Sequence, residues 1–291
     1  MPVMSRQSRG YWTSAATFCV IWSLGFPVAK MAVAVCPPEL FLAMRFLVAS
    51  AMMLGWAAWR GYLTASVPWL GLAGLGLVSF AMTNGLAWVS LRWISAGLST
   101  IIASSQPVLV GIFGALLLSD HLKLGRIVGL VLGVGGVAFV VRNRIVLGGE
   151  DAFGVALMVA SVASQATGTI LYKRWSPRVP LTVLVGTQQL AAGIAMLVLG
   201  LATESTQAIV LGKILWMTLA YTTFLNSIVT FQLWFAMLAR GSATAVASLQ
   251  FIMPPLGLIF SWLLLGESIM PIDLAGIVPI ALGIWLTTRP R

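Results

Sequence analysis

Eight amide or aromatic residues lie near the centres of long apolar segments, and no carboxylate or histidine accompanies them. They are Trp22, Asn84, Trp88, Gln106, Gln165, Tyr221, Asn226 and Gln250. Amides donate and accept hydrogen bonds without carrying charge, and aromatic rings pack against apolar groups. Such a set suits binding of an apolar or zwitterionic small molecule. The alternative for each residue is a hydrogen bond that holds neighbouring helices together.

The spacing of these residues indicates which of them share a surface. Asn84 and Trp88 are four residues apart and therefore lie on one face of a helix. Tyr221 and Asn226 are five residues apart, about 140° around a helix, so we expect only one of them to face a common cavity. Most tryptophans suit the membrane interface, and Trp22 and Trp88 are the two expected to contact a ligand.

Two basic residues lie within the apolar segments. Arg45 is seven residues into the segment 38–59, about 10 Å below its outer end. It must either extend outward to water or face other helices and meet an anion. Lys30 lies near the outer end of the preceding segment. A ligand carboxylate passing through an outer vestibule could meet either cation, and the alternative is a structural contact between helices.

Two prolines, Pro107 and Pro254, lie in the middle of apolar segments. Each removes a backbone hydrogen bond and bends its helix. The pair could act as matched hinges, or each could form a static kink needed for packing.

Few residues in the sequence could support catalysis or bind a metal. The sole histidine, His121, is predicted in a turn, so a His-pair metal site or a Ser–His dyad cannot form. There is no phosphate-binding glycine-rich loop with a lysine. All seven acidic residues lie in loops or at segment ends, which leaves no carboxylate for proton exchange at the membrane centre. We therefore expect no enzyme, no cofactor and no metal.

Composition defines the elements that must position these residues. Of 291 residues, 59% are hydrophobic and 8% are charged, whereas a soluble domain carries about 25% charged residues. Each membrane span needs about 20 apolar residues, and the sequence predicts an all-α bundle in the lipid bilayer. The ten predicted spans are 11–32, 38–59, 67–92, 95–118, 125–142, 152–174, 180–201, 212–239, 242–265 and 272–288.

The distribution of lysine and arginine predicts the orientation. With the N-terminus in the cytoplasm, inner segments hold eleven basic residues and outer segments hold four. This asymmetry satisfies the positive-inside rule and places both termini in the cytoplasm of a multi-pass protein. The net charge of +10 therefore arises mostly from the basic residues that set the orientation in the membrane. Because the basic residues are scattered among loops, a nucleic-acid partner is not expected.

An internal repeat divides the chain into halves, 1–145 and 146–291. Residues 95–142 align with 242–289 at a constant offset of 147, and earlier spans align more loosely near 143. Each half contains five predicted spans, and because five is odd the second half must be inverted. Two inverted five-helix repeats are a common construction of secondary transporters. The alternative is a chance similarity between apolar helices.

Three sequence patterns and Arg45 in the second predicted span are distinctive. The patterns are Trp22-Ser23-Leu24-Gly25-Phe26-Pro27, Ser95-Ala96…Pro107…Leu116-Leu117-Leu118-Ser119-Asp120…Gly129 and Gly241-Ser242-Ala243…Pro254…Leu264-Leu265-Gly266-Glu267…Gly276. They resemble the drug/metabolite transporter superfamily, in its EamA-like group, although the first half has Ser119-Asp120 where Gly-Glu is usual. The resemblance covers nearly the whole chain and implies export of metabolites, amino acids or drugs across the bacterial inner membrane. The tryptophan-rich character is similar to YddG-type amino acid exporters.

The resemblance and the neutral, aromatic-rich centre together predict export of amino acids by alternating access, with aromatic or apolar side chains favoured. One alternative is efflux of lipophilic cationic drugs, bound by cation–π contacts to tryptophan. The other is a membrane scaffold that transports nothing. Resistance to quaternary ammonium compounds would favour the first alternative, and failure to move any solute in vesicles would favour the second.

Overall fold

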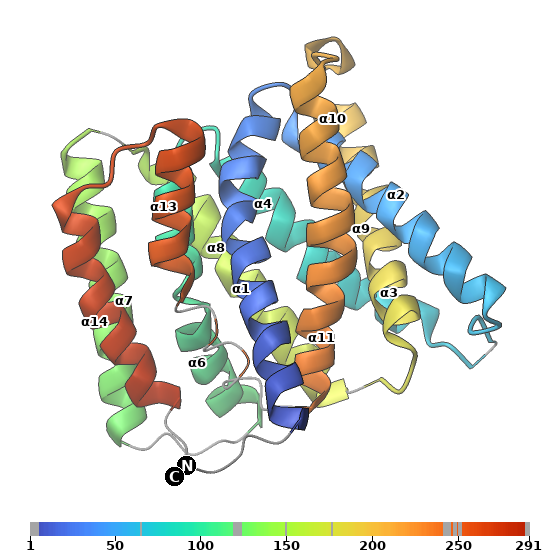
Figure 1. The fold of residues 1–291 in the computed structure, drawn as a ribbon, viewed down its shortest axis with the longest axis horizontal. Coiled ribbons are helices and arrows are strands. Elements are labelled where there is room, and N and C mark those ends of the chain that lie inside the picture. Colours follow the sequence, from blue (N-terminus) through green and yellow to red (C-terminus); the bar gives the residue numbers. More distant parts are fainter. Residues whose placement is uncertain are drawn as a thin grey trace.

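The protein is a bundle of helices. The computed structural model describes residues 6–64, 66–118, 124–148, 150–175, 177–240, 246, 249 and 252–288. Within these ranges the regular elements are helices and no strand occurs, so the predicted all-α fold is confirmed. The first helix begins, and the last helix ends, at the same end of the bundle (Figure 1).

The helices follow the predicted spans closely. In the first half they are α1 (Arg6–Val33), α2 (Pro38–Trp59), α3 (Trp69–Gly76), η1 (Leu77–Met82), α4 (Thr83–Ser90), α5 (Ala96–Ala103), α6 (Gln106–Leu118) and α7 (Leu124–Val146). In the second half they are α8 (Ala152–Trp175), α9 (Leu181–Thr203), η2 (Thr206–Ala208), α10 (Lys213–Ala220), η3 (Tyr221–Thr230), α11 (Phe231–Arg240), α13 (Met253–Leu265) and α14 (Pro271–Thr288).

Seven helical stretches among the described residues are long and apolar enough to cross a membrane. They coincide with seven of the ten predicted spans. The stretches are Thr13–Val33, Pro38–Trp59, Trp69–Ser90, Ala96–Leu117, Ala152–Trp175, Leu181–Thr203 and Lys213–Arg240. Shorter apolar helices cover Met253–Leu265 and Pro271–Gly283, and α7 covers the predicted span 125–142. The chain is thus a multi-pass membrane protein, and its full count of ten spans stays a prediction.

Two spans contain π-helical turns that the sequence does not predict. These turns, η1 and η3, lie in the middle of otherwise continuous helices. In each, a threonine hydroxyl donates to the carbonyl five residues earlier: Thr83 Oγ1 to Val78 O at 3.0 Å and Thr230 Oγ1 to Leu225 O at 2.8 Å. The hydroxyl satisfies a carbonyl that the wider turn displaces. Such turns frequently occur at functional sites.

The two predicted kink prolines lie near helix starts. Pro107 is the second residue of α6, and the preceding residues Ser104 and Ser105 form a turn after α5. Because proline cannot donate to the carbonyl of Ala103 and its ring crowds that carbonyl, the helix is interrupted here. Pro254 is the second residue of α13, and most of the chain just before it lies outside the described residues. A hinge role for either proline stays a prediction.

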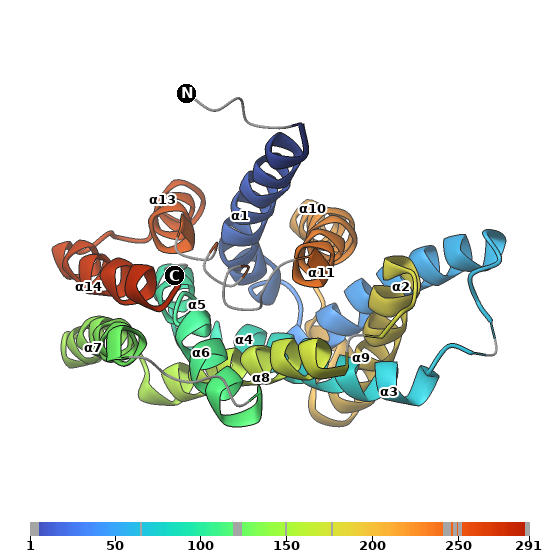
Figure 2. The same ribbon diagram turned by 90° about the horizontal axis from the view of Figure 1, so that it is seen from below.

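Helices from the two halves pack against each other. α2 packs along α9 and α7 packs along α14, and these two groups form opposite sides of the bundle (Figures 1 and 2). α1 packs against α13, while α8 packs against α4, α5 and α6. Between α7 and α14 the backbones almost touch, because a Cβ added at Gly283 would lie 2.8 Å from Gly133 Cα. Small residues permit this approach.

Gly283→Ala is expected to lower the stability of the protein by about 1–3 kcal/mol, because the new methyl group overpacks the α7–α14 contact. Gly135→Ala on α7 is the matched control, since a Cβ there meets nothing within 4 Å. Thermal unfolding in detergent measures both variants. Equal melting temperatures for the two variants would show that the α7–α14 contact is not tight.

Candidate binding cavity

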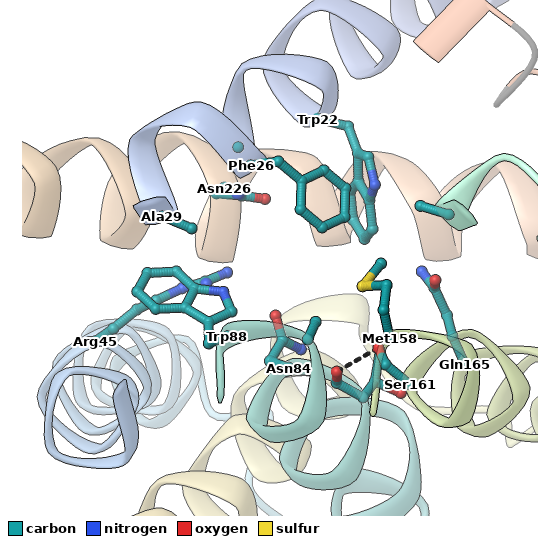
Figure 3. A pocket seen from close by; sticks show the side chains of 14 residues that line it. Trp22, Phe26, Ala29, Arg45, Asn84, Trp88, Met158, Ser161, Gln165 and Asn226 are labelled. Carbon is teal, nitrogen blue, oxygen red and sulfur yellow. Dashed lines mark hydrogen bonds between the residues drawn. The ribbon is translucent and has the colours of Figure 1, made fainter. Parts of the chain in front are cut away.

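A cavity of about 50 Å³ lies between α1, α2, α4, α8 and η3 (Figure 3). The lining is mostly apolar, with one cation and a few amides and hydroxyls, and contains no acidic residue. The lining residues are Trp22, Gly25, Phe26, Ala29, Arg45, Thr83, Asn84, Ala87, Trp88, Ala103, Met158, Ser161, Gln165 and Asn226.

Six of the residues selected from the sequence line this cavity. They come from five separate elements, α1, α2, α4, α8 and η3, which explains why they lie far apart in the chain. In Figure 3, Arg45 and Trp88 lie at one side of the cavity, Trp22 and Gln165 lie at the other, and Asn84 lies between them. The six are Trp22, Arg45, Asn84, Trp88, Gln165 and Asn226.

The other predicted ligand-contacting residues lie elsewhere. Gln106 is fully buried, and its Nε2 donates to Thr169 Oγ1 at 3.5 Å. The Tyr221 hydroxyl donates to the Ile21 carbonyl at 2.7 Å, which ties η3 to α1. Both therefore form contacts between helices, the alternative already considered for each. Of the pair on η3, only Asn226 lines the cavity. Gln250 lies outside the described residues.

Several cavity residues were not selected from the sequence. Phe26 and Met158 are ordinary apolar residues, and nothing in their type distinguishes them from residues that face lipid. Helical spacing could have found some of them, because Phe26 is four residues after Trp22 and Ser161 is four before Gln165. The Ser161 hydroxyl donates to the Thr83 carbonyl at 2.6 Å and joins α8 to α4 (Figure 3).

Arg45 is the only charged residue among the lining residues, and only 1% of its surface is exposed. Its Nε donates to Ser227 Oγ at 2.7 Å. Its guanidinium carbon lies 4.9 Å from the centre of the Phe46 ring and 5.6 Å from that of Trp88. In the described part of the chain, the ion pairs involve Arg92 and Arg144 and do not include Arg45. A buried cation without a carboxylate partner is costly, so this position favours an anionic ligand group.

Lys30, which was considered together with Arg45, does not line the cavity. Its Nζ donates to the carbonyls of Leu91 and Ile94, the latter at 2.8 Å. These carbonyls lie in the segment that follows α4, where a cation complements the dipole of that helix. Lys30 thus makes a structural contact, whereas Arg45 lines the cavity. A role of either cation in an outer vestibule stays a prediction.

Asn84 leaves an acceptor available in the cavity. Its Nδ2 donates to the Phe80 carbonyl at 3.0 Å. The amide therefore has its Oδ1 to offer a donor. Asn226 packs closely against α1, since a Cβ at Gly25 would lie 2.8 Å from Asn226 Nδ2. Glycine at this position lets the amide approach.

A carboxylate binds the N-terminus of α5. Glu267 accepts from the backbone amides of Ala96 and Gly97, both at 2.9 Å. Gly266 has a φ of 67° and ends α13 in the left-handed conformation. The carboxylate therefore turns towards α5, whose free amides favour an anion.

A helical membrane protein with a buried cavity of this lining has the character of a carrier for small molecules. The sequence model of the EamA-like transporter family matches residues 11–142 and again 152–289. The chain therefore belongs to the EamA-like transporter family, as the sequence motifs predicted, and it is a transporter and not an enzyme.

Individual relatives agree with this membership. The chain is similar to the uncharacterized transporter YvbV of Bacillus subtilis, with 29% identity over 93% of this chain and 89% of the relative. It is also similar to proteins named probable amino-acid metabolite efflux pump. The protein of that name from Salmonella typhimurium is 28% identical over 92% of this chain and 91% of its own length. The protein of that name from Escherichia coli is 25% identical over 92% of this chain and 91% of its own length.

A solved structure shares the fold. One crystal structure superposes on the chain with a TM-score of 0.74, covers 96% of both chains and has 18% sequence identity. At this identity the likeness shows the arrangement of helices alone.

Proposed function

We propose that the protein exports amino acids across the bacterial inner membrane, and that it favours aromatic or apolar side chains. One observation carries the proposal: Arg45 lines an otherwise uncharged cavity and has no carboxylate partner among the described residues. A substrate carboxylate would pair with the guanidinium, which presents its donors in a planar fork. Two relatives named as amino-acid metabolite efflux pumps support the substrate class.

The rest of the cavity suits the remaining parts of an amino acid. Asn84 Oδ1 is available to accept from the substrate ammonium group, because its Nδ2 already donates to Phe80 O. The Trp22 and Phe26 rings lie across the cavity from Arg45 (Figure 3). An apolar side chain there would pack against the rings while the carboxylate stays with the cation. This orientation favours aromatic and large aliphatic amino acids.

The proposed mechanism is alternating access between two inverted five-helix repeats, residues 1–145 and 146–291, with both termini in the cytoplasm. Support comes from the family match, which falls once in each half. Further support comes from the matched pairs α2–α9 and α7–α14 and from the π-helical turn present in each half. Two similar halves can exchange conformations and so open the cavity to either side.

The two alternatives fit the cavity less well. Efflux of lipophilic cations could use the tryptophan rings, but Arg45 would repel a cation brought into the same space. A scaffold without transport gives no reason for a buried, unpaired arginine beside polar side chains that line an empty space.

Proteoliposomes preloaded with a panel of radiolabelled amino acids test the proposal. The protein is expected to release phenylalanine, leucine or a similar substrate faster than protein-free liposomes do. A quaternary ammonium compound in parallel vesicles serves as the comparison. No acceleration for any amino acid, or selective release of the ammonium compound, would contradict the substrate class.

A further inference from the structure

The Arg45 guanidinium is held in one orientation by a hydrogen bond and two aromatic rings. Its Nε donates to Ser227 Oγ at 2.7 Å, and both side chains are almost completely buried. The guanidinium carbon lies 4.9 Å from the centre of the Phe46 ring and 5.6 Å from that of Trp88. Trp88 in turn stacks on Phe41, with ring centres 5.0 Å apart. These contacts restrict a side chain that otherwise has many rotamers.

The hydrogen bond to Ser227 leaves one edge of the guanidinium available. A guanidinium has five N–H donors, of which one is on Nε and the others are on Nη1 and Nη2. Ser227 takes the Nε donor, and within the described part of the chain neither Nη atom has a hydrogen-bond partner. The Nη1–Nη2 edge can therefore form two parallel hydrogen bonds to the oxygens of a carboxylate.

The Ser227 hydroxyl is placed by the end of the π-helical turn η3. In a regular α-helix the Phe231 amide would donate to the Ser227 carbonyl, four residues earlier. Here it donates to the Ile228 carbonyl. The Ser227 carbonyl accepts from Gln189 Nε2 of α9 at 2.8 Å, and Gln189 is fully buried. Contacts therefore run without a break from α9 through Ser227 to Arg45.

These contacts join the two halves of the protein beside the cavity. Arg45 belongs to α2 in the first half, whereas Ser227 and Gln189 belong to η3 and α9 in the second half. α2 packs along α9 and also against η3. The orientation of the free guanidinium edge therefore depends on residues from both halves.

We propose that Ser227 and Gln189 are positioning residues, which hold Arg45 so that its Nη1–Nη2 edge binds a substrate carboxylate. Gln189 holds Ser227, Ser227 holds Arg45, and neither of the two is among the residues that line the cavity. Without the serine hydroxyl, the substrate itself would have to order the guanidinium, and binding would weaken. The role of both residues rests on the proposed function, in which Arg45 binds the carboxylate.

Counterflow kinetics with phenylalanine in proteoliposomes test this role. Ser227→Ala is expected to raise the KM about fivefold, the cost of ordering one long side chain on binding, and to leave kcat within about twofold. Gln189→Leu removes the bond to the Ser227 carbonyl and should raise the KM by a smaller factor, because it acts on Arg45 only through Ser227. KM does not depend on how much of each variant folds.

Two comparisons separate positioning from a general effect on the fold. Thr222→Val removes another fully buried hydroxyl of η3, which donates to the Thr218 carbonyl at 2.7 Å, and should leave the KM unchanged. In an Arg45→Gln background, Ser227→Ala should have no further effect on the KM, because the group that Ser227 positions is gone. A defect of the fold would instead add to the effect of Arg45→Gln.

Three results would contradict different parts of the proposal. A KM for Ser227→Ala equal to that for Thr222→Val, or the same increase with and without Arg45, would overturn the positioning role. An unchanged KM in Gln189→Leu would show that Gln189 has no part in it. If the unmodified protein exchanges no amino acid, the proposed function itself fails.

Discussion

Replacing Arg45 with glutamine is expected to lower phenylalanine export about tenfold or more. The substrate carboxylate would lose a charged hydrogen-bond partner, a contact worth about 1.5–3 kcal/mol. The loss should appear as a raised KM for every amino acid, whatever its side chain. Initial rates of counterflow over a range of phenylalanine and alanine concentrations measure it.

Two further variants show whether this loss is specific. Arg60→Gln removes an arginine at the other end of α2 that also lies over tryptophan rings, 5.5 Å from Trp56 and 5.9 Å from Trp59. It lies outside the cavity and should leave the KM unchanged. Arg45→Lys keeps the charge but not the planar fork, so partial activity is expected. Full activity of Arg45→Gln would show that Arg45 does not bind the substrate carboxylate.

Arg144→Met is expected to destabilise the protein by about 3–5 kcal/mol. Arg144 pairs with Glu150 at 2.9 Å and with Asp273 at 2.5 Å, and the side chains of both acids are at most 2% exposed. Removing the arginine leaves two buried carboxylates without a countercharge. Thermal unfolding in detergent and the amount of folded protein in membranes measure this effect.

The matched control for Arg144 is another arginine that pairs with a glutamate. Arg92 bonds Glu204 at 2.6 Å, but its side chain is 41% exposed. Arg92→Gln should therefore cost about 0–1 kcal/mol. Replacing Arg144, Glu150 and Asp273 together by Met, Gln and Asn should recover part of the loss. If Arg144→Met is as stable as Arg92→Gln, the ion pairs of Arg144 with Glu150 and Asp273 do not hold α7 and α14 together.

The helices and several cavity residues could be predicted because their signals are strong. An apolar run of about 20 residues has few structural alternatives, so the described helices follow the predicted spans. A polar residue at the centre of such a run is costly in lipid, so it must face protein or a cavity. This reasoning selected Asn84, Gln165, Asn226 and Arg45, all of which line the cavity.

The other cavity residues could not be predicted, because they depend on how each helix is rotated about its axis. The sequences of these helices indicate that rotation only weakly. The helices are apolar on all faces, so polarity alone does not tell a cavity from a helix contact. Gln106 and Tyr221 were selected for the same reason as Asn226, yet they bond Thr169 and Ile21. The π-helical turns η1 and η3 contain no glycine or proline from which they could have been predicted. Phe26 and Met158 line the cavity through rotation and packing alone.

Whether Arg45 binds the substrate carboxylate is tested most directly by a counterflow competition among phenylalanine, phenethylamine, which lacks the carboxylate, and 3-phenylpropionate, which lacks the ammonium group. Unlabelled competitors are added to proteoliposomes that are exchanging labelled phenylalanine. If Arg45 binds the carboxylate, phenylalanine competes fully, 3-phenylpropionate competes in part and phenethylamine does not compete. Competition by phenethylamine as strong as that by phenylalanine would show that Arg45 does not bind a substrate carboxylate and would indicate a carrier of lipophilic cations.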